Sequence, residues 1–152
     1  MSSWLRNISA YLDRHKSYGA VFIRLAFGVH LVRSSYPEVF DPSAQREFAS
    51  YLASIGVPFP LVGSYLCHFA EFFGGLALIL GLLVRPFGAV LVINFLVAIF
   101  VAQWGKPYKE TFQAIQALAV ALFSLVNGAG ALSNDSFLRR KGSSEVGVEA
   151  AT

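Results

Sequence analysis

Charged residues are scarce in this sequence. Only 14% of its 152 residues are Asp, Glu, Lys or Arg, against about 25% in ordinary globular proteins, whereas 55% are hydrophobic. The charges gather at the termini and in short connecting stretches, and they leave four long segments almost bare. The length predicts one domain, and the composition argues against an ordinary water-soluble one.

Cysteine is almost absent as well. Cys67 is the only one, which excludes an internal disulfide and a Cys-x-x-Cys redox pair within this chain. Alone it is expected to be a small packing residue. No metal site is expected either, because His30 and His68 find only Glu71 and Cys67 as further candidate ligands.

The sequence also lacks a basic stripe with interleaved aromatic residues. The net charge of +3 and the pI near 9.2 therefore do not indicate nucleic acid binding. Basic residues beside apolar segments are typical of anchors that face a membrane. The first 17 residues are too polar for the apolar region of a cleavable signal peptide, so none is expected.

Four apolar segments have the length of membrane spans. They cover Tyr18 to Tyr36, Pro60 to Val84, Pro86 to Trp104 and Thr111 to Ala131. Each approaches the ~20 residues needed to cross roughly 30 Å of hydrocarbon, and none has the wide polar stripe of a soluble bundle helix. Their length and their Leu, Ala and Gly content disfavour strands. The sequence predicts an all-α integral membrane bundle of four transmembrane helices.

Two further segments show helical spacing of apolar residues. Residues 4–15 predict a short amphipathic helix on the membrane surface, with a frayed N-terminus as the alternative. In the 37–59 connection, Pro42 and Ser43 can open a helix that Gly56 and Pro58 end. Its apolar residues are Phe48, Tyr51, Leu52 and Ile55. We expect an interfacial helix between spans one and two that covers the outer mouth of the bundle.

The predicted organisation has three parts and a defined orientation. An amphipathic segment (1–17) precedes the four-helix domain (18–135) and a flexible polar tail (136–152). Seven Lys and Arg residues lie on the side of the termini and four on the other side. The seven are Arg6, Arg14, Lys16, Arg85, Arg139, Arg140 and Lys141, and the four are Arg33, Arg46, Lys106 and Lys109. The positive-inside rule then predicts that both termini are cytoplasmic.

Three polar side chains interrupt three different spans at one depth. Arg24, Glu71 and Asn94 lie 12, 11 and 10 residues from the outer ends of their spans, which is roughly 15–18 Å. Ionisable residues in spans usually face the bundle interior and pair with one another. We expect Arg24 to be the counter-charge of Glu71, with Asn94 and His68 completing the hydrogen bonds of the carboxylate.

These residues define a candidate polar site inside the bundle. Glu71 and His68 are the expected catalytic, proton-transferring groups. The expected substrate-binding residues are Arg24, Asn94, His30, Gln103 and Gln116. Such a cavity suits a quinone head group or a small anion. The alternative is a buried ion pair that only fixes which helices pack together.

Four blocks of the sequence resemble the DoxX family of small four-helix membrane proteins. They are "IRLAFGVHLVRS", "GVPFP", "AEFFGGLALILGLLVRP" and "NGAGALSND", and the resemblance runs from about residue 18 to 135. Arg24, Glu71, Arg85 and Asp135 fall on positions that recur in the family. The sequence departs from the family pattern at Leu31, Arg33 and Gln103.

The resemblance implies a four-helix membrane bundle in the bacterial inner (cytoplasmic) membrane. Some family members are similar to the membrane subunit of thiosulfate:quinone oxidoreductase, so it also implies a quinone-linked oxidoreductase subunit. Such a subunit would bind a quinone non-covalently, or an anion such as thiosulfate, at the level of Arg24, Glu71 and His68. Because the sequence has no flavin, haem or iron–sulfur motif, the electron carrier would be the quinone itself or a partner.

Two other functions stay open from the sequence. One is a non-catalytic scaffold or assembly subunit of a larger membrane complex. The other, a small transporter, is the weakest because no inverted repeat is detectable. The expected partners are the lipid bilayer and other membrane or redox subunits, with oligomers of the chain itself as a further expectation.

Overall fold

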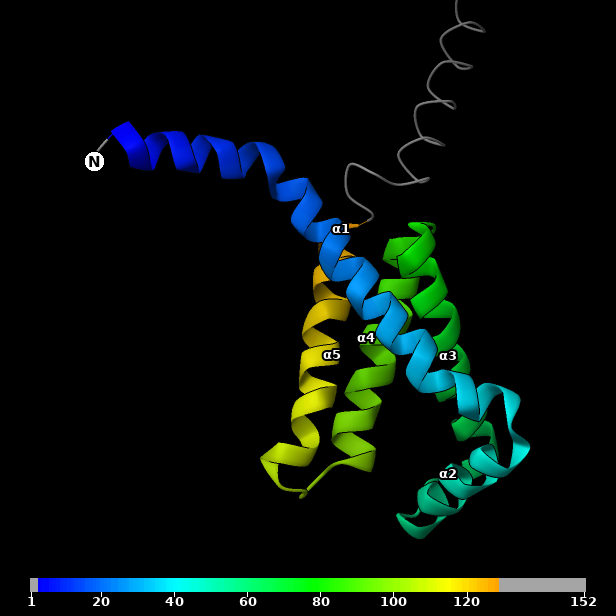
Figure 1. Cartoon of the computed structure of the whole chain (residues 1–152). Helices are drawn as coiled ribbons and strands as arrows, with labels where there is room; N and C mark the ends of the chain where they lie inside the picture. Colours follow the sequence, from blue (N-terminus) through cyan, green and yellow to red (C-terminus); the bar gives the residue numbers. More distant parts are fainter. Residues whose placement is uncertain (1–2, 129–152) are drawn as a thin grey trace, which may run out of the picture.

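The computed structural model describes residues 3–128, and every regular element among them is a helix (Figure 1). The elements are α1 (Ser3–Phe40), α2 (Pro42–Ser54), α3 (Pro60–Leu80), α4 (Val84–Val97), the short π-helix η1 (Ala98–Ala102) and α5 (Tyr108–Asn127). The all-α prediction is confirmed for this part of the chain. The predicted tail and the end of the predicted four-helix domain lie outside the described residues.

Three helical stretches are long and apolar enough to cross a membrane. They are Pro60–Leu80, Val84–Ala102 and Tyr108–Asn127, which correspond to the second, third and fourth predicted spans. Helix α3 ends at Leu80, because the next residue, Gly81, has φ +66°. It is therefore shorter than the predicted span, which continued to Val84. Helix α5 begins and ends a few residues before its predicted bounds. These helices support an integral membrane helical bundle.

Helix α1 differs from the sequence prediction. It is one continuous helix of 38 residues, so it joins the predicted amphipathic segment to the first predicted span. Pro37 lies inside its last turns and not beyond its end. The helix continues past Pro37 to Phe40, where the backbone N–H of Asp41 donates to the Pro37 carbonyl at 2.7 Å. The first turns of α1 extend away from the other helices (Figure 1).

The segment predicted to form an interfacial helix is helical, as α2. The Asp41 carboxylate caps its first turn by accepting hydrogen bonds from the Ser43 backbone N–H at 2.8 Å and the Ser43 hydroxyl at 2.6 Å. The hydrogen bonds from Ser43 hold the pKa of the Asp41 carboxyl below its usual value. Pro42 lies in the first turn, where no intrahelical N–H is needed.

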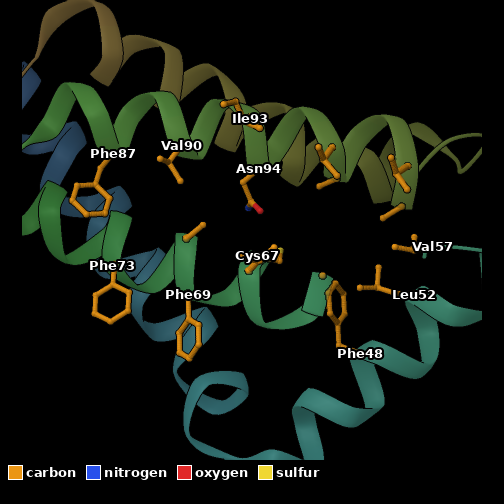
Figure 2. Close-up of a pocket in the computed structure, with 17 residues that line it drawn as sticks. Phe48, Leu52, Val57, Cys67, Phe69, Phe73, Phe87, Val90, Ile93 and Asn94 are labelled. Carbon is orange, nitrogen blue, oxygen red and sulfur yellow. The ribbon is translucent and has the colours of Figure 1, made fainter. Parts of the chain in front are cut away.

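Helix α2 lies across one end of the bundle. Leu52 is buried, Phe48 and Tyr51 are half-buried, and Ile55 is exposed. Phe48 and Leu52 face the space between α3 and α4 (Figure 2). The Tyr51 hydroxyl donates to the Ala102 carbonyl at 2.6 Å, at the end of η1. Helix α2 therefore connects the start of α3 with the end of η1, as expected of a helix that covers the outer mouth.

Glycines let the helices of the bundle approach closely. A Cβ atom added to Gly28 of α1 would lie 2.8 Å from the Gly75 carbonyl oxygen of α3, and one added to Gly75 would lie 2.9 Å from the Gly28 carbonyl oxygen. Gly74 faces the other way, because an added Cβ there would meet Leu91 of α4 at 2.9 Å. Adjacent glycines of α3 thus receive two different helices, as small residues commonly do in membrane bundles.

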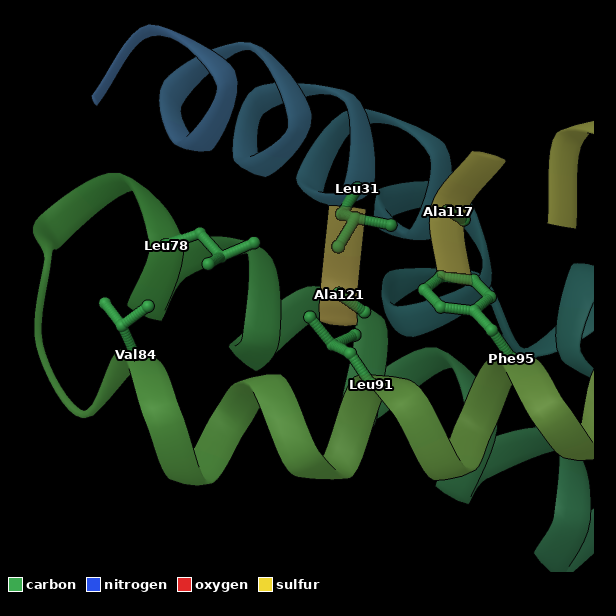
Figure 3. Packing of buried hydrophobic residues seen from close by; sticks show 7 residues of the cluster. All are labelled: Leu31, Leu78, Val84, Leu91, Phe95, Ala117 and Ala121. Carbon is green, nitrogen blue, oxygen red and sulfur yellow. The ribbon is translucent and has the colours of Figure 1, made fainter. Parts of the chain in front are cut away.

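The hydrophobic core lies where these helices converge. Its buried residues come from α1, α3, α4 and α5 and pack together in Figure 3. They are Leu31, Leu78, Val84, Leu91, Phe95, Ala117 and Ala121. The α1–α3 crossing and this core together fix the level of each polar side chain relative to the others.

We expect Gly28→Ala to lower the stability of the folded protein. The new methyl group would meet backbone atoms of α3, which cannot rotate away, and overpacking of this kind typically costs about 1–3 kcal/mol. Gly19→Ala is the matched control, because an added Cβ at Gly19 has nothing within 4 Å. Thermal unfolding in detergent compares the two variants. Equal stability of Gly28→Ala and Gly19→Ala would refute the close crossing.

Candidate functional site

Glu71 has its closest polar partners on α3 itself and on α4. The Asn94 side-chain amide donates to Glu71 Oε1 at 3.1 Å, which confirms the predicted Asn94 contact. The Cys67 thiol, one helical turn before Glu71, donates to the same oxygen at 3.8 Å. Cys67 was expected to pack only. Its spacing of four residues from Glu71 is the sequence signal that could have revealed this contact.

An apolar groove opens beside this polar group. It has a volume of about 570 Å³ and lies between α3 and α4, with residues of α2 at one end. Figure 2 shows Asn94 directed from α4 into the groove, opposite Cys67 of α3. Most other lining residues are aliphatic or aromatic, among them Phe69, Phe73 and Val90. The groove therefore combines a long apolar wall with one small polar region.

His68 lies in a separate buried network. Its Nδ1 atom is 3.2 Å from Gln45 Oε1 of α2, and its ring packs against the Phe48 ring with centroids 4.8 Å apart. The Ser64 hydroxyl donates to the Gln45 carbonyl at 3.2 Å and also to Gln45 Oε1. The hydrogen bond predicted between His68 and Glu71 is thus corrected, because α2 supplies the partner of His68.

This network has two buried atoms without a hydrogen-bond partner in residues 3–128. They are Gln45 Nε2 and Glu38 Oε2. Glu38 also interacts electrostatically with both His68 and Glu71. Sequence reasoning missed Gln45, which shares one face of α2 with Ala49 and Leu52, all of them buried. The four-residue spacing from Ser64 to His68 was a second available signal.

Arg24 does not pair with Glu71. Its guanidinium lies against Gly81, at the end of α3, since a Cβ atom added to Gly81 would be 2.9 Å from Arg24 Nη1. Gly81 follows Glu71 by ten residues, about 15 Å along a helix. Arg24 is buried, with 6% of its surface exposed. The predicted ion pair is wrong, and Arg24 occupies a different level of the bundle.

The helix register explains this error. Helices α1 and α3 run antiparallel and cross at Gly28 and Gly75. Four residues after Gly28, Val32 lies level with Glu71, which is four residues before Gly75. Four residues before Gly28, Arg24 lies level with the last turn of α3. The depth estimate counted from Tyr36, whereas α1 continues to Phe40.

Two arginines lie at helix C-termini on the same side of the bundle. Arg24 lies beside Gly81, after α3, and Arg85 lies beside Gly128, after α5, where its Nε would be 3.0 Å from an added Cβ. The last carbonyl groups of a helix carry partial negative charge, which a guanidinium stabilises. This position gives the buried Arg24 a role in holding α1 against the end of α3.

The other predicted binding residues lie away from Glu71. His30 of α1 and Gln116 of α5, together with Gln113, line a second groove of about 470 Å³ that shares no residue with the first. Gln103 follows η1, and its Oε1 atom is buried without a hydrogen-bond partner in the described part of the chain. The structure therefore divides the predicted site into Glu71 with Asn94, the His68 network, Arg24, Gln103 and a separate polar groove.

The fold and the intramembrane carboxylate define a helical membrane protein with a polar group beside an apolar groove. The chain belongs to the DoxX family, because the DoxX family model matches residues 19–104, more than half of the sequence. The matched part includes Glu71, Asn94 and most of the groove, and it ends before α5. No curated protein and no solved structure gave a significant match.

The separation of Arg24 from Glu71 predicts additive mutational effects. Arg24→Met should lower stability by up to about 2 kcal/mol through loss of a buried charge at a helix C-terminus. Combined with Glu71→Gln, the losses should add to within about 0.5 kcal/mol. Asn94→Leu with Glu71→Gln is the control pair, because these residues are in contact and should show coupling. Thermal unfolding of the single and double variants tests this. Strong coupling between Arg24 and Glu71 would contradict the assigned register.

Proposed function

We propose that this chain is the membrane subunit of a redox-associated complex and binds a quinone in the groove between α3 and α4. The observation that carries the proposal is a long apolar groove with a single polar region at Asn94 and Cys67. A quinone has a matching structure: a long apolar isoprenoid tail and a small polar ring with two carbonyl acceptors. Ligand sites of this type are mostly apolar, with a few polar groups that fix orientation.

The polar region offers a hydrogen-bond donor that a carbonyl oxygen of the quinone ring can accept. The Asn94 amide has two N–H groups, of which one is needed for Glu71. The other is available to a carbonyl oxygen in the groove. The single S–H of Cys67 is donated to Glu71, so Cys67 adds a polarisable sulfur to the opposite wall but no free donor. Both side chains are fixed by Glu71, so the carboxylate positions them.

A small anion such as thiosulfate fits this position less well. An anion beside Asn94 would face the Glu71 carboxylate, while the guanidinium of Arg24 lies about 15 Å away along α3. Like charges at close range disfavour binding. The arrangement of charges therefore favours a neutral head group, and of the two expected ligands we retain the quinone.

Proton transfer is the chemistry that these side chains can contribute. Reduction of a quinone to a quinol takes up two electrons and two protons, and the electrons would come from a redox centre, such as a haem or flavin, in a partner subunit. Glu71 can hold a proton beside the groove. His68 lies one helical turn from Glu71 and reaches the outer helix α2 through Gln45. We propose that protons reach Glu71 from the side of α2, where Gln45 contacts His68.

The proposed topology has four spans, with α1 as the first. Helix α1 packs along α3 over much of its length, and about 20 residues before Phe40 suffice to cross the bilayer. Arg24 and Arg85 lie at the end of the bundle that the positive-inside rule places on the cytoplasmic side of a bacterial inner membrane.

Single cysteines replacing Leu5 and Glu145 in a Cys67→Ser background should therefore be labelled from the same, cytoplasmic side.

Asn94→Leu should weaken quinone binding by roughly 3- to 10-fold, because one hydrogen bond to the ring is lost. The probe is a short-chain ubiquinone analogue, titrated calorimetrically against the full chain in lipid nanodiscs. Asn127→Leu is the matched control. It is the same amide-to-apolar change, and Asn127 lies outside the groove, where it bonds to the Phe123 carbonyl.

Unchanged affinity in Asn94→Leu would contradict the proposed orientation. If the wild-type chain binds no quinone analogue, the quinone proposal fails. The assembly-subunit alternative would then account for the polar contacts of Glu71 as packing determinants.

A further inference from the structure

Three polar side chains form an exposed surface on the opposite flank of the bundle from Asn94. His30 of α1 and Gln113 and Gln116 of α5 line the second groove, together with Phe27, Ala117 and Val120. All three polar side chains are exposed. We refer to His30, Gln113 and Gln116 as the polar seam. It shares no residue with the quinone groove.

The polar seam lies at membrane depth. Gln116 follows the start of α5 by eight residues, about 12 Å, and His30 precedes the end of α1 by ten residues, about 15 Å. The His30 ring packs beside Phe27, with centroids 6.4 Å apart. Within residues 3–128, no hydrogen bond joins the three seam side chains to any partner. Polar groups that face hydrocarbon without partners are costly.

The chemistry of the seam matches a second copy of itself. Each glutamine amide is both a donor and an acceptor, and so is a neutral imidazole. Two such surfaces related by a twofold axis can therefore satisfy each other's donors and acceptors. Helices α1 and α5 contact each other only over a short stretch, which leaves the seam accessible.

We propose that the polar seam is the interface of a homodimer in the membrane, where glutamine and histidine side chains of the two copies hydrogen-bond to each other. This proposal goes beyond quinone binding and does not depend on it. It assigns to Gln113, Gln116 and His30 a role in association and not in the substrate site.

The first test is the association of the full chain in lipid bilayers, measured by single-molecule photobleaching over a range of protein-to-lipid ratios. The wild-type chain should dimerise. The Gln113→Leu/Gln116→Leu variant should associate roughly 3- to 10-fold more weakly, because interhelical hydrogen bonds in membranes are individually modest. The control variant Leu122→Ala/Val126→Ala changes exposed residues of α5 outside the seam and should associate as the wild type does.

A second test depends on proximity alone. In a Cys67→Ser background, Gln116→Cys should form disulfide-linked dimers on mild oxidation in the membrane, and Leu122→Cys should not. A chain that stays monomeric at every density would overturn the proposal. Equal dimerisation of the double leucine variant, or a cross-link from position 116 to an unlike protein, would overturn it as well. Thermal unfolding of the leucine variant in detergent should stay at the wild-type value, which separates association from folding.

Discussion

The close crossing of α1 and α3 at Gly28 and Gly75 determines where the polar groups of this bundle lie. Two backbones can approach this closely only where side chains are absent, so the antiparallel register of the two helices is fixed at one point. From that point, Arg24 reaches the C-terminus of α3 and Val32 comes level with Glu71. A shift of one helical turn would bring a different set of side chains to each level.

This register separates two charges that a simple depth count brings together. Arg24 is held against Gly81, at the C-terminal end of α3, and Glu71 bonds with Asn94 and Cys67 beside an apolar groove. The carboxylate therefore lies beside the groove without an arginine partner. In the function we propose, this arrangement suits a neutral, amphipathic ligand.

The sequence predicted best those features that depend on local chemistry. The start of α2 followed from Pro42 and Ser43 and its end from Gly56 and Pro58, whereas the Asp41 cap was not predicted. The Glu71–Asn94 contact followed from depth counting, because the outer ends of α3 and η1 were both placed within about two residues. Arg24 was misplaced because its depth was counted from Tyr36, whereas α1 continues through Pro37 to Phe40.

Features that depend on packing between helices were not predictable in the same way. The groove is lined by Phe, Val and Ile, which are the residues expected at any lipid-facing surface, so its position follows only from how α3 and α4 diverge. His68 looked like a partner of Glu71, and only the position of α2 shows that Gln45 binds it. His30 and Gln116 were assigned to one site with Glu71, whereas the packing of α1 beside α5 places them together in a different groove.

Native mass spectrometry of the protein released from its own membrane in native-lipid nanodiscs would test the central claim most directly. The full chain should retain a quinone, identified by fragmentation of the bound molecule, and Asn94→Leu should lose it while keeping its annular phospholipids. A groove that retains only phospholipid in the wild-type protein, or a quinone that stays equally bound in Asn94→Leu, would contradict the account.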